Sequence, residues 1–394
     1  MLFRQAEHRL LRMAQSFPVV VVTGPRQSGK TTLVQSAFPG RPYVSMEDLD
    51  VRRRVLDDPR LFLQQHADGV LIDEVQRVPE LLSYLQTQVD AQKMPGRYIL
   101  TGSQNLLMTE QISQSLAGRA AYLDLLPLSY AEAEAIDKKL SLDTLMLRGS
   151  YPQVVLSGVA PSEWFEAYVR SYIERDVRQI SQINDLTAFQ RFLRMMAARA
   201  GQLVNLNAIG ADLGLAQTTI KAWLSILEAS YITFRLMPYH THFGKRLVKT
   251  PKLYFYDTGL VAWLLGIHDA STMNVHPMRG ALFENFMILQ YLKFCKNTGR
   301  NDQLYFWRDN TGNEMDLLIE RAGVLSAIEL KSGATFNTEW LRAMDIWMKH
   351  TDGARRSAGM VISDAPMNTW YRSYFAAHWR SASMQLAADL PVTA

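Results

Sequence analysis

Residues 17–31 read FPVVVVTGPRQSGKT, and this stretch decides the fold of the N-terminal part of the chain. Its first half is a continuous apolar run that ends at Gly24. Such a run is typical of a parallel strand that is buried on both faces. Its second half fits the pattern G-x-x-x-x-G-K-[ST], follows the strand directly and opens a helix at Lys30. The order of strand, glycine-rich turn and helix predicts a phosphate-binding loop, and this context argues against a chance match.

The residue types in this loop suit a triphosphate. Gly24 and Gly29 let the backbone wrap closely, so that consecutive N–H groups point at phosphates, and the helix N-terminus adds positive potential. We expect Lys30 to reach the β- and γ-phosphates and the Thr31 hydroxyl to bind Mg²⁺. The predicted nucleotide-binding residues are Gly24, Pro25, Arg26, Gln27, Ser28, Gly29, Lys30, Thr31 and Thr32.

A second apolar run, residues 70–72, ends in the acids Asp73 and Glu74. Open α/β sheets bind ligands at the carboxyl ends of their strands, so we expect both acids beside the loop. Asp73 would hold Mg²⁺ through water or Thr31, and Glu74 would orient or deprotonate the attacking water. Taken alone, such a pair is commonly two solvated acids; paired with the upstream loop it indicates a nucleotide-hydrolysing site.

A third expected strand, YILTGSQ at residues 98–104, ends in small polar residues. In ATPases with an additional strand between the two motif strands, that strand carries a polar sensor near the γ-phosphate. Ser103 is the candidate and Thr101 the fallback, with a merely polar strand terminus as the alternative. Three roles are open for Arg119. It senses the γ-phosphate in cis, it acts as an arginine finger in trans within a homo-oligomer, or it forms a structural ion pair. The sequence lacks a guanine-reading N-K-x-D segment, which favours ATP over GTP.

Strands that alternate with helices predict a three-layer α/β domain over roughly residues 17–130. The chain has 394 residues, 48% of them apolar and 20% charged, which excludes a wholly disordered protein. Its net charge of +4 permits nucleic-acid binding only through a local surface. The single cysteine fits a reducing compartment, no apolar run approaches a membrane span, and the start MLFRQAEHRLL lacks the apolar region of a signal peptide. We expect a cytoplasmic protein without membrane contact.

Residues 203–228 show the pattern of a helix-turn-helix, with a turn at Gly214 and apolar positions that face inward. The stretches YITFRLMPYH and KLYFYD would supply the strands of a wing. A basic wing can neutralise phosphates, although winged helices also serve as protein-binding modules and lysine-rich loops are commonly just solvated. The candidates for DNA contact are Gln217, Thr218 and Lys221 on the second helix and Lys245, Arg246, Lys249 and Lys252 in the wing.

Three pieces of sequence after residue 280 assemble into an acidic constellation. Glu284 lies on a helix that opens with GALFENF, Asp316 begins the strand of EMDLLIE, and Glu329 and Lys331 lie two apart in LSAIELK. The period of two in a strand places Glu329 and Lys331 on the same face. An antiparallel hairpin with a turn at Ala322-Gly323 brings Asp316 beside that face.

The chemistry of this D…E-x-K set is definite. The carboxylates of Asp316 and Glu329 are oxygen ligands for Mg²⁺. A metal there lowers the pKa of bound water and stabilises charge on a phosphodiester, and Lys331 would position that water or steady the developing charge. A structural Glu–Lys pair at a sheet edge is the alternative, because a lysine between apolar neighbours needs a partner.

With these residues assembled, the chain resembles a prokaryotic family of AAA-type ATPases with a C-terminal domain known as DUF4143. The resemblance runs almost end to end. Its landmarks are GPRQSGKTTL, LIDEVQRVPELL, LTGSQNLL, SLAGRAAYLDLLPLS, LRGSYPQVV, YIERDV, LYFYDTGL, GALFENF, and NEMDLLIE with AIELKSG. Two departures, GSYP at residues 149–152 in place of the usual double glycine and Gln104 after the sensor where serine is common, touch no catalytic role.

The resemblance implies an α/β chain of four parts. These are an AAA-like P-loop domain at residues 1–130, a helical lid or linker at 131–202, a winged helix at 203–262 and a PD-(D/E)xK, restriction-endonuclease-like domain at 263–394. The family's motifs match this sequence at Lys30, Thr31, Asp73 and Glu74 and at Glu284, Asp316, Glu329 and Lys331.

Two functions fit this organisation. The first is an ATP-hydrolysing enzyme of DNA processing or defence whose metal-dependent nuclease domain is controlled by nucleotide state. The second is an ATP-dependent switch whose winged-helix and C-terminal domains bind a partner without cutting it. A third interpretation is a regulator of a protein partner, similar to signalling ATPases, which predicts no salt-sensitive affinity for DNA.

Overall fold

The structure is a computed structural model, and it describes residues 3–103, 116–138, 140–173, 185–239, 250–350 and 356–385. The chain divides into two compact units. Unit 1 comprises Met1–Leu128, Leu227–Ile232 and Lys296–Gly299, and unit 2 comprises Ser129–Ile226, Thr233–Cys295 and Arg300–Ala394. Each unit is built around its own sheet.

Unit 1 contains a parallel sheet of five strands in the order β2-β3-β4-β1-β5. Its strands are β1 (Val19–Thr23), β2 (Tyr43–Ser45), β3 (Val70–Asp73), β4 (Tyr98–Thr101) and β5 (Ala120–Asp124). Its helices are α1 (Glu7–Ser16), α2 (Lys30–Ala37), α3 (Leu49–Asp57), α4 (Pro59–Gln65) and α5 (Leu81–Ala91), with a 3₁₀ turn at Val75–Arg77. Strand β4 lies between β3 and β1, as expected for the strand that carries the sensor.

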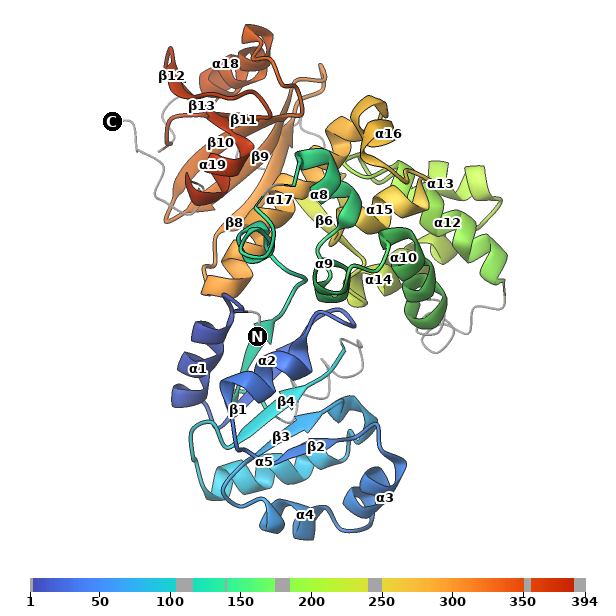
Figure 1. Cartoon of the computed structure of the whole chain (residues 1–394), viewed down its shortest axis with the longest axis vertical. Coiled ribbons are helices and arrows are strands. Elements are labelled where there is room, and N and C mark those ends of the chain that lie inside the picture. The colour runs from blue at the N-terminus through green and yellow to red at the C-terminus, as the bar shows by residue number, and fades with distance from the viewer. Residues whose placement is uncertain are drawn as a thin grey trace. The chain divides into compact units, whose positions relative to one another are not determined.

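The sheet of unit 1 is the middle of three layers (Figure 1). Successive valines of β1 point to opposite faces, so Val19 and Val21 pack with α3, α4 and α5, whereas Val20 and Val22 pack with α1 and α2. All four valines are fully buried. A parallel strand covered on both faces has no polar face, which explains the unbroken apolar run in the sequence. The predicted three-layer α/β domain is therefore confirmed.

Two short segments from far along the chain complete unit 1. Tyr231 donates a hydrogen bond to Asp124 Oδ1 at 2.6 Å, and Lys296 Nζ lies 2.6 Å from Asp124 Oδ2. Thr23 Oγ1 also donates to Asp124 Oδ1, at 3.0 Å. Since Thr23 ends β1 and Asp124 ends β5, these contacts fix both segments at the carboxyl edge of the sheet.

Unit 2 contains a mixed sheet of eight strands, ordered β12-β13-β11-β10-β9-β8-β6-β7, with helices before, between and after its strands in the chain. Its helices are α7 (Tyr130–Glu134), α8 (Leu142–Arg148), α9 (Pro152–Ser157), α10 (Pro161–Tyr168), α12 (Leu186–Ala198), α13 (Leu206–Leu213), α14 (Gln217–Ala229), α15 (Thr258–Leu264), α16 (Ala270–Val275), α17 (Arg279–Thr298), α18 (Leu341–His350) and α19 (Trp379–Gln385), with a π-helical turn at Val169–Ile173 and a 3₁₀ turn at Thr338–Trp340; the ends of α14 and α17 belong to unit 1. Its strands are β6 (Thr233–Pro238), β7 (Lys252–Phe255), β8 (Gln303–Arg308), β9 (Glu314–Arg321), β10 (Val324–Lys331), β11 (Met360–Ser363), β12 (Asn368–Tyr371) and β13 (Tyr374–His378).

The stretch expected to be a helix-turn-helix contains the two helices α13 and α14. The Asn205 side chain caps α13 by accepting from Ala208 N at 3.1 Å, and Gly214 ends the helix with a left-handed φ of 69°. The inward positions of α14 are buried; they are Ile220, Trp223, Leu224 and Leu227.

The two expected wing strands belong to a larger sheet. Strand β6 pairs antiparallel with β7 and also pairs in parallel with β8, where Met237 lies opposite Tyr305. The strands expected for the wing and those of the C-terminal region therefore share one sheet. This continuity brings β7 close to the acids of the C-terminal strands.

Candidate functional site: a phosphate-binding loop and an acidic cluster

The loop after β1 has the backbone that a phosphate site needs. Gly24 has a φ of 145°, and a Cβ at this position would lie 2.2 Å from the Leu125 carbonyl oxygen, so only glycine fits. Gly29 has a φ of 90° and precedes the first residue of α2. The Arg4 guanidinium stabilises the loop by donating hydrogen bonds to the carbonyl oxygens of Ser28 and Leu126, both at 2.8 Å.

Lys30 is folded back into the loop that it follows. Its Nζ donates to the carbonyl oxygens of Gly24 at 3.0 Å and Pro25 at 2.8 Å. Burial lowers the pKa of Lys30 to about 8, against the attraction of Glu74 and Asp73, which raises it. A buried ammonium held by carbonyl oxygens near the loop's N–H groups is a cation in place for an anionic ligand.

Asp73 is the centre of a hydroxyl cluster at the carboxyl edge of the sheet. Its Oδ2 accepts from Thr31 Oγ1 at 2.9 Å and from Tyr43 OH at 2.7 Å, and its Oδ1 accepts from Thr101 Oγ1. The predicted convergence of the loop and the acid-tipped strand is thus present. Thr101, the fallback candidate for the sensor, therefore donates its hydroxyl hydrogen bond to Asp73.

Glu74 is held by a residue that the sequence patterns do not single out. Its backbone is left-handed, with a φ of 53°, which is a strained conformation for a residue other than glycine. The Gln76 amide donates both to Glu74 Oε2 and to Ser103 Oγ, the latter at 3.2 Å. Gln76 therefore links the predicted base to the predicted sensor.

A second cluster of charged side chains lies in unit 2 and contains all four residues of the predicted C-terminal constellation. Lys331 Nζ lies 2.5 Å from Glu329 Oε1 and 3.7 Å from Asp316 Oδ2. The backbone N–H of Leu330 donates to Asp316 Oδ2 at 2.8 Å. The antiparallel register, in which Ile328 lies opposite Leu317, makes Asp316 and Glu329 the next pair along the two strands.

Two further charged residues complete this acidic cluster, which we define as Glu284, Glu314, Asp316 and Glu329 with Lys252 and Lys331. Lys252 Nζ lies 2.8 Å from Glu284 Oε1 and also contacts Glu314, and Tyr254 donates to Glu284. Carboxylate oxygens of Glu284, Glu314 and Asp316 lie within 4.8 Å of one another. The prediction that Lys252 belongs to a basic wing surface is wrong, because the side chain is 2% exposed and paired with two acids.

Two acids of this cluster, Glu284 and Glu329, carry a proton more readily than ordinary carboxyls. Burial raises the pKa of Glu284, and the Asp316 charge raises it further against the attraction of Lys252. Burial and then the Asp316 charge raise the pKa of Glu329 against the attraction of Lys331. Burial is the largest cause of both raised pKa values, and the neighbouring Asp316 charge adds to it.

Three family models match successive parts of the chain. A model described as an AAA domain matches residues 16–134, and models described as domains of unknown function match residues 139–271 (DUF8612) and 279–380 (DUF4143). Uncharacterized proteins of Mycobacterium bovis and Mycobacterium tuberculosis are each 33% identical over 337 residues, which cover 84% of this chain and 74% of theirs. The chain belongs to the family of AAA-type P-loop ATPases that carry a C-terminal DUF4143 domain.

Solved structures also resemble this AAA-type ATPase. A Walker-type ATPase of Pyrococcus abyssi shares 16% identity at a TM-score of 0.47 and covers 67% of this chain and 96% of its own. A variant of the RuvB protein of Thermotoga maritima shares 18% identity at a TM-score of 0.31 and covers 58% of this chain and 88% of its own. Among the described residues of the ATPase, no helix is both long enough and apolar enough to span a bilayer.

Arg119 of the ATPase does not lie near the phosphate-binding loop. It precedes β5 at the amino edge of the sheet, where Val19 N donates to its carbonyl oxygen at 3.4 Å. Its guanidinium pairs with Asp90, with Nε to Oδ1 at 2.6 Å and Nη2 to Oδ2 at 2.8 Å. The prediction that Arg119 senses the γ-phosphate in cis is wrong, because the loop is at the other end of the strands. The structure shows an ion pair with Asp90, and the role in trans stays a prediction.

The residues predicted to contact DNA are only partly described. Gln217, Thr218 and Lys221 are exposed on α14, as a groove-reading helix requires. Lys245, Arg246 and Lys249 lie outside the described residues, as does Gln104.

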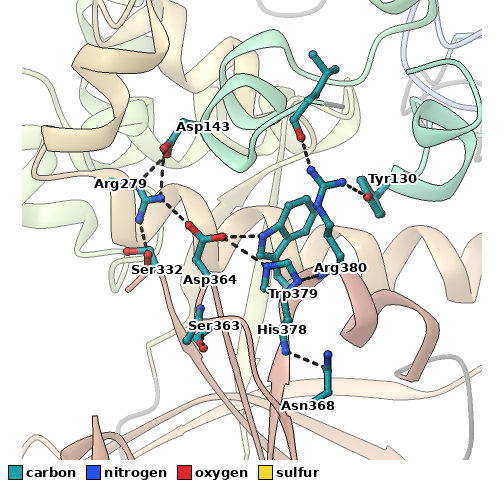
Figure 2. Close-up of polar contacts among 12 residues, drawn as sticks. Tyr130, Asp143, Arg279, Ser332, Ser363, Asp364, Asn368, His378, Trp379 and Arg380 are labelled. Carbon is teal, nitrogen blue, oxygen red and sulfur yellow. Dashed lines mark hydrogen bonds and ion pairs between the residues drawn. The ribbon is translucent and has the colours of Figure 1, made fainter. Parts of the chain in front are cut away.

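A polar network fixes the start of α17, the helix that carries Glu284 (Figure 2). Arg279 Nε donates to Asp143 Oδ1 on α8 at 2.7 Å, and Nη2 lies 3.3 Å from Asp364 Oδ2. Nη1 of the same guanidinium donates to the carbonyl oxygen of Ser332. Asp364 also accepts from Trp379 Nε1 at 2.9 Å. Arg279 thus joins α8, α17 and the ends of two strands.

Proposed function

We propose that this protein binds and hydrolyses ATP at the loop of residues 24–31. The observation that carries the proposal is the 2.9 Å contact between Thr31 Oγ1 and Asp73 Oδ2, with the ammonium of Lys30 buried beside them. These are the residue types that the P-loop and the acid-tipped strand of such ATPases supply. Their meeting at one edge supports a site for a nucleoside triphosphate.

Each side chain has a role that its position supports. Lys30 leaves the loop carbonyls and binds the β- and γ-phosphate oxygens. Glu74 orients the attacking water and accepts its proton, and Ser103 contacts the γ-phosphate. Thr31 and Asp73 offer hydroxyl and carboxylate oxygens, which are the ligands that Mg²⁺ prefers; when bound, Mg²⁺ neutralises phosphate charge.

Two substitutions test the ATPase proposal. Lys30→Ala removes the phosphate-binding cation, so nucleotide binding is expected to be lost. Glu74→Gln keeps the shape of the site, so binding is expected to persist while turnover falls by roughly 10²-fold or more. Lys93→Ala, which removes an exposed lysine in the same unit, is the control and should hydrolyse ATP as the natural protein does. Normal turnover in Glu74→Gln would refute the assignment of the base.

A second proposed activity is metal-dependent cleavage of DNA at the acidic cluster, controlled by nucleotide state. The convergence of Asp316, Glu329 and Lys331 favours it, since two carboxylates and a lysine suit water activation at a phosphodiester. Asp316 and Glu329 would hold the Mg²⁺, which when bound lowers the pKa of a water. Lys331 would orient that water, and Glu284 would complete the negative wall of the site.

A cleavage assay tests the second activity. Duplex, single-stranded and branched DNA are incubated with Mg²⁺ or Mn²⁺, with and without ATP, and any cutting is expected to vanish in Asp316→Asn and Lys331→Ala. Persistence of cutting in both variants would assign it elsewhere. If no substrate is cut under any condition, the ATP-dependent switch is the better function.

DNA is the partner that we propose for α14. The exposed Gln217, Thr218 and Lys221 would face the groove, and phosphate contacts make such binding fall steeply with salt. The triple variant Gln217→Ala/Thr218→Ala/Lys221→Ala is expected to bind DNA more weakly at low salt. Affinity that neither salt nor this variant changes would indicate a protein partner instead.

A further inference from the structure

The ammonium of Lys252 lies among the carboxylates that surround the proposed metal site. It is 2.8 Å from Glu284 Oε1 and in contact with Glu314, and oxygens of these two acids and Asp316 fall within 4.8 Å of one another. The face of the Phe306 ring lies 5.5 Å from the same nitrogen. Lys252 is the first residue of β7, and all four residues of that strand are buried. Its charge is therefore held inside unit 2 and not on a surface.

A second observation concerns Glu329, another acid of the same cluster. Glu329 is 4% exposed, and its Oε2 has no hydrogen-bond partner among the described residues. Its other oxygen is paired with Lys331 at 2.5 Å. A buried carboxylate oxygen without a partner is costly, and a cation near Asp316 would relieve that cost.

The acidic cluster contains one more carboxyl group than it has cationic partners. Four carboxylates face the ammonium groups of Lys252 and Lys331, and Arg308 adds a third positive group at 3.1 Å from Glu314 Oε2. Replacing an ammonium by a divalent ion adds one positive charge among these four carboxyl groups. Three carboxylate oxygens at this spacing are also hard ligands. They bind a divalent cation in preference to an ammonium.

We infer that the Lys252 ammonium occupies the cation position formed by Glu284, Glu314 and Asp316, so that Lys252 and a divalent metal ion compete for it. This inference rests on the proposed metal-dependent function: it shares Asp316 with the ligands proposed there and adds Glu284 and Glu314 to them. The ammonium sits on a flexible stem of four carbons, so the metal binds when that stem withdraws. Lys252 thereby sets the metal concentration at which the site fills.

The inference is tested by comparing Lys252→Met with Lys252→Arg in the full chain without nucleotide. Methionine fills the apolar space without a charge, whereas arginine keeps a cation in place. Mn²⁺ binding is followed by the paramagnetic signal of free Mn²⁺ and by the rise in the unfolding temperature. Lys252→Met is expected to bind Mn²⁺ at least about tenfold more tightly than the natural protein, and Lys252→Arg no more tightly.

The double variant Lys252→Met/Asp316→Asn identifies the site, because it lacks one of the ligands and should lose the gain in affinity. Equal Mn²⁺ affinity in Lys252→Met and the natural protein overturns the inference, and so does a gain that survives Asp316→Asn. Lys252→Gln serves as a second neutral variant. If neither neutral variant folds even with Mn²⁺ present, a metal cannot replace the ammonium and the inference fails.

The failure of this inference is distinguishable from the failure of the proposed nuclease activity, because metal affinity is measured without DNA. Tighter Mn²⁺ binding by Lys252→Met in a protein that cuts no DNA supports the competition and refutes the nuclease. Cutting that depends on Asp316, together with unchanged Mn²⁺ affinity in Lys252→Met, supports the nuclease and refutes the competition.

Discussion

Arg279 donates a hydrogen bond to the carbonyl oxygen of Ser332, the residue that directly follows Lys331. Five residues after Arg279, the same helix presents Glu284 to the acidic cluster. The guanidinium therefore ties the helix that carries one acid of the cluster to the strand end that carries its lysine. Asp143 and Asp364 complete the set of partners (Figure 2).

Arg279→Met is expected to destabilise unit 2. The side chain is 13% exposed and its loss leaves Asp143 and Asp364 with an uncompensated charge. Breaking such a buried pair costs about 3 kcal/mol. All eight tryptophans of the chain belong to unit 2, so their fluorescence during urea unfolding reports on this unit.

Arg342→Met, which removes an exposed arginine on α18, is the matched control and should unfold like the natural protein. In a double-mutant cycle, Asp143→Asn is expected to add little to Arg279→Met, because the interaction is already lost. Strictly additive effects of the two substitutions would contradict the proposed pairing.

The buried Lys30 predicts that the stability of the nucleotide-free protein rises between pH 8 and about pH 10. Burial lowers the pKa of Lys30 to about 8 in the folded state, whereas an unfolded lysine keeps a pKa of about 10.4. Between these values the unfolded chain binds more protons than the folded one, so the free energy of unfolding increases with pH, by at most about 3 kcal/mol.

Lys30→Met lacks this titration and supplies the comparison. Since the tryptophans report only on unit 2, unfolding is followed by far-ultraviolet circular dichroism, which reports on the secondary structure of both units. As the pH rises from 8 to 10, the unfolding free energy of the natural protein should increase relative to that of Lys30→Met. A difference that does not change with pH would show that Lys30 is not held as a buried ammonium.

Local sequence patterns predicted the parts of the sites whose residues are close in the chain or related by strand periodicity. The valine run could only be a strand covered on both faces, and the glycines at 24 and 29 could only be a tight loop. Glu329 and Lys331 share a face because the side chains of a strand alternate. These relations depend on backbone geometry alone, so the sequence carries them.

The residues that the sequence did not single out enter the sites through long-range contacts. Tyr43 meets Asp73 because β2 pairs with β3, and no motif in the sequence marks that pairing. Lys252 was assigned to a basic wing because of its neighbours in sequence, yet α17 supplies its partner Glu284 from 32 positions away. One signal was available: a lysine at the start of the apolar stretch KLYF needs a buried partner, as was argued for Lys331.

Gln76 is expected to position Glu74 for hydrolysis. Its amide donates to Glu74 and to Ser103 Oγ, so Gln76→Ala frees the carboxylate from one of its contacts. We expect kcat for ATP to fall by about tenfold with little change in KM, because the phosphate-binding loop is intact. Steady-state ATPase kinetics measure both parameters.

The neighbouring Arg77→Ala serves as control, since the Arg77 side chain makes a surface ion pair with Glu47 at 3.5 Å, and the substitution keeps the backbone hydrogen bond from Arg77 N to the Glu74 carbonyl oxygen. Gln76→Glu places a second negative charge beside Glu74 and is expected to be as slow as Gln76→Ala. An unchanged kcat in Gln76→Ala would show that the amide only fills space.

Arg119 and Asp90 give the last prediction, because they decide between a structural and a trans role. The two side chains form a bidentate pair at the amino edge of the sheet, far along the strands from Lys30. If the pair is structural, Arg119→Ala and Asp90→Ala have the same small effect on stability, as expected for an exposed ion pair. Neither substitution then changes the ATPase rate per subunit at any protein concentration.

The opposite outcome would assign the guanidinium to the nucleotide of a neighbouring subunit. In that case the rate per subunit grows with protein concentration in the natural protein and in Asp90→Ala, but is low at every concentration in Arg119→Ala. Arginine is the only member of the pair that can stabilise phosphate charge, so a loss confined to its substitution has no structural explanation.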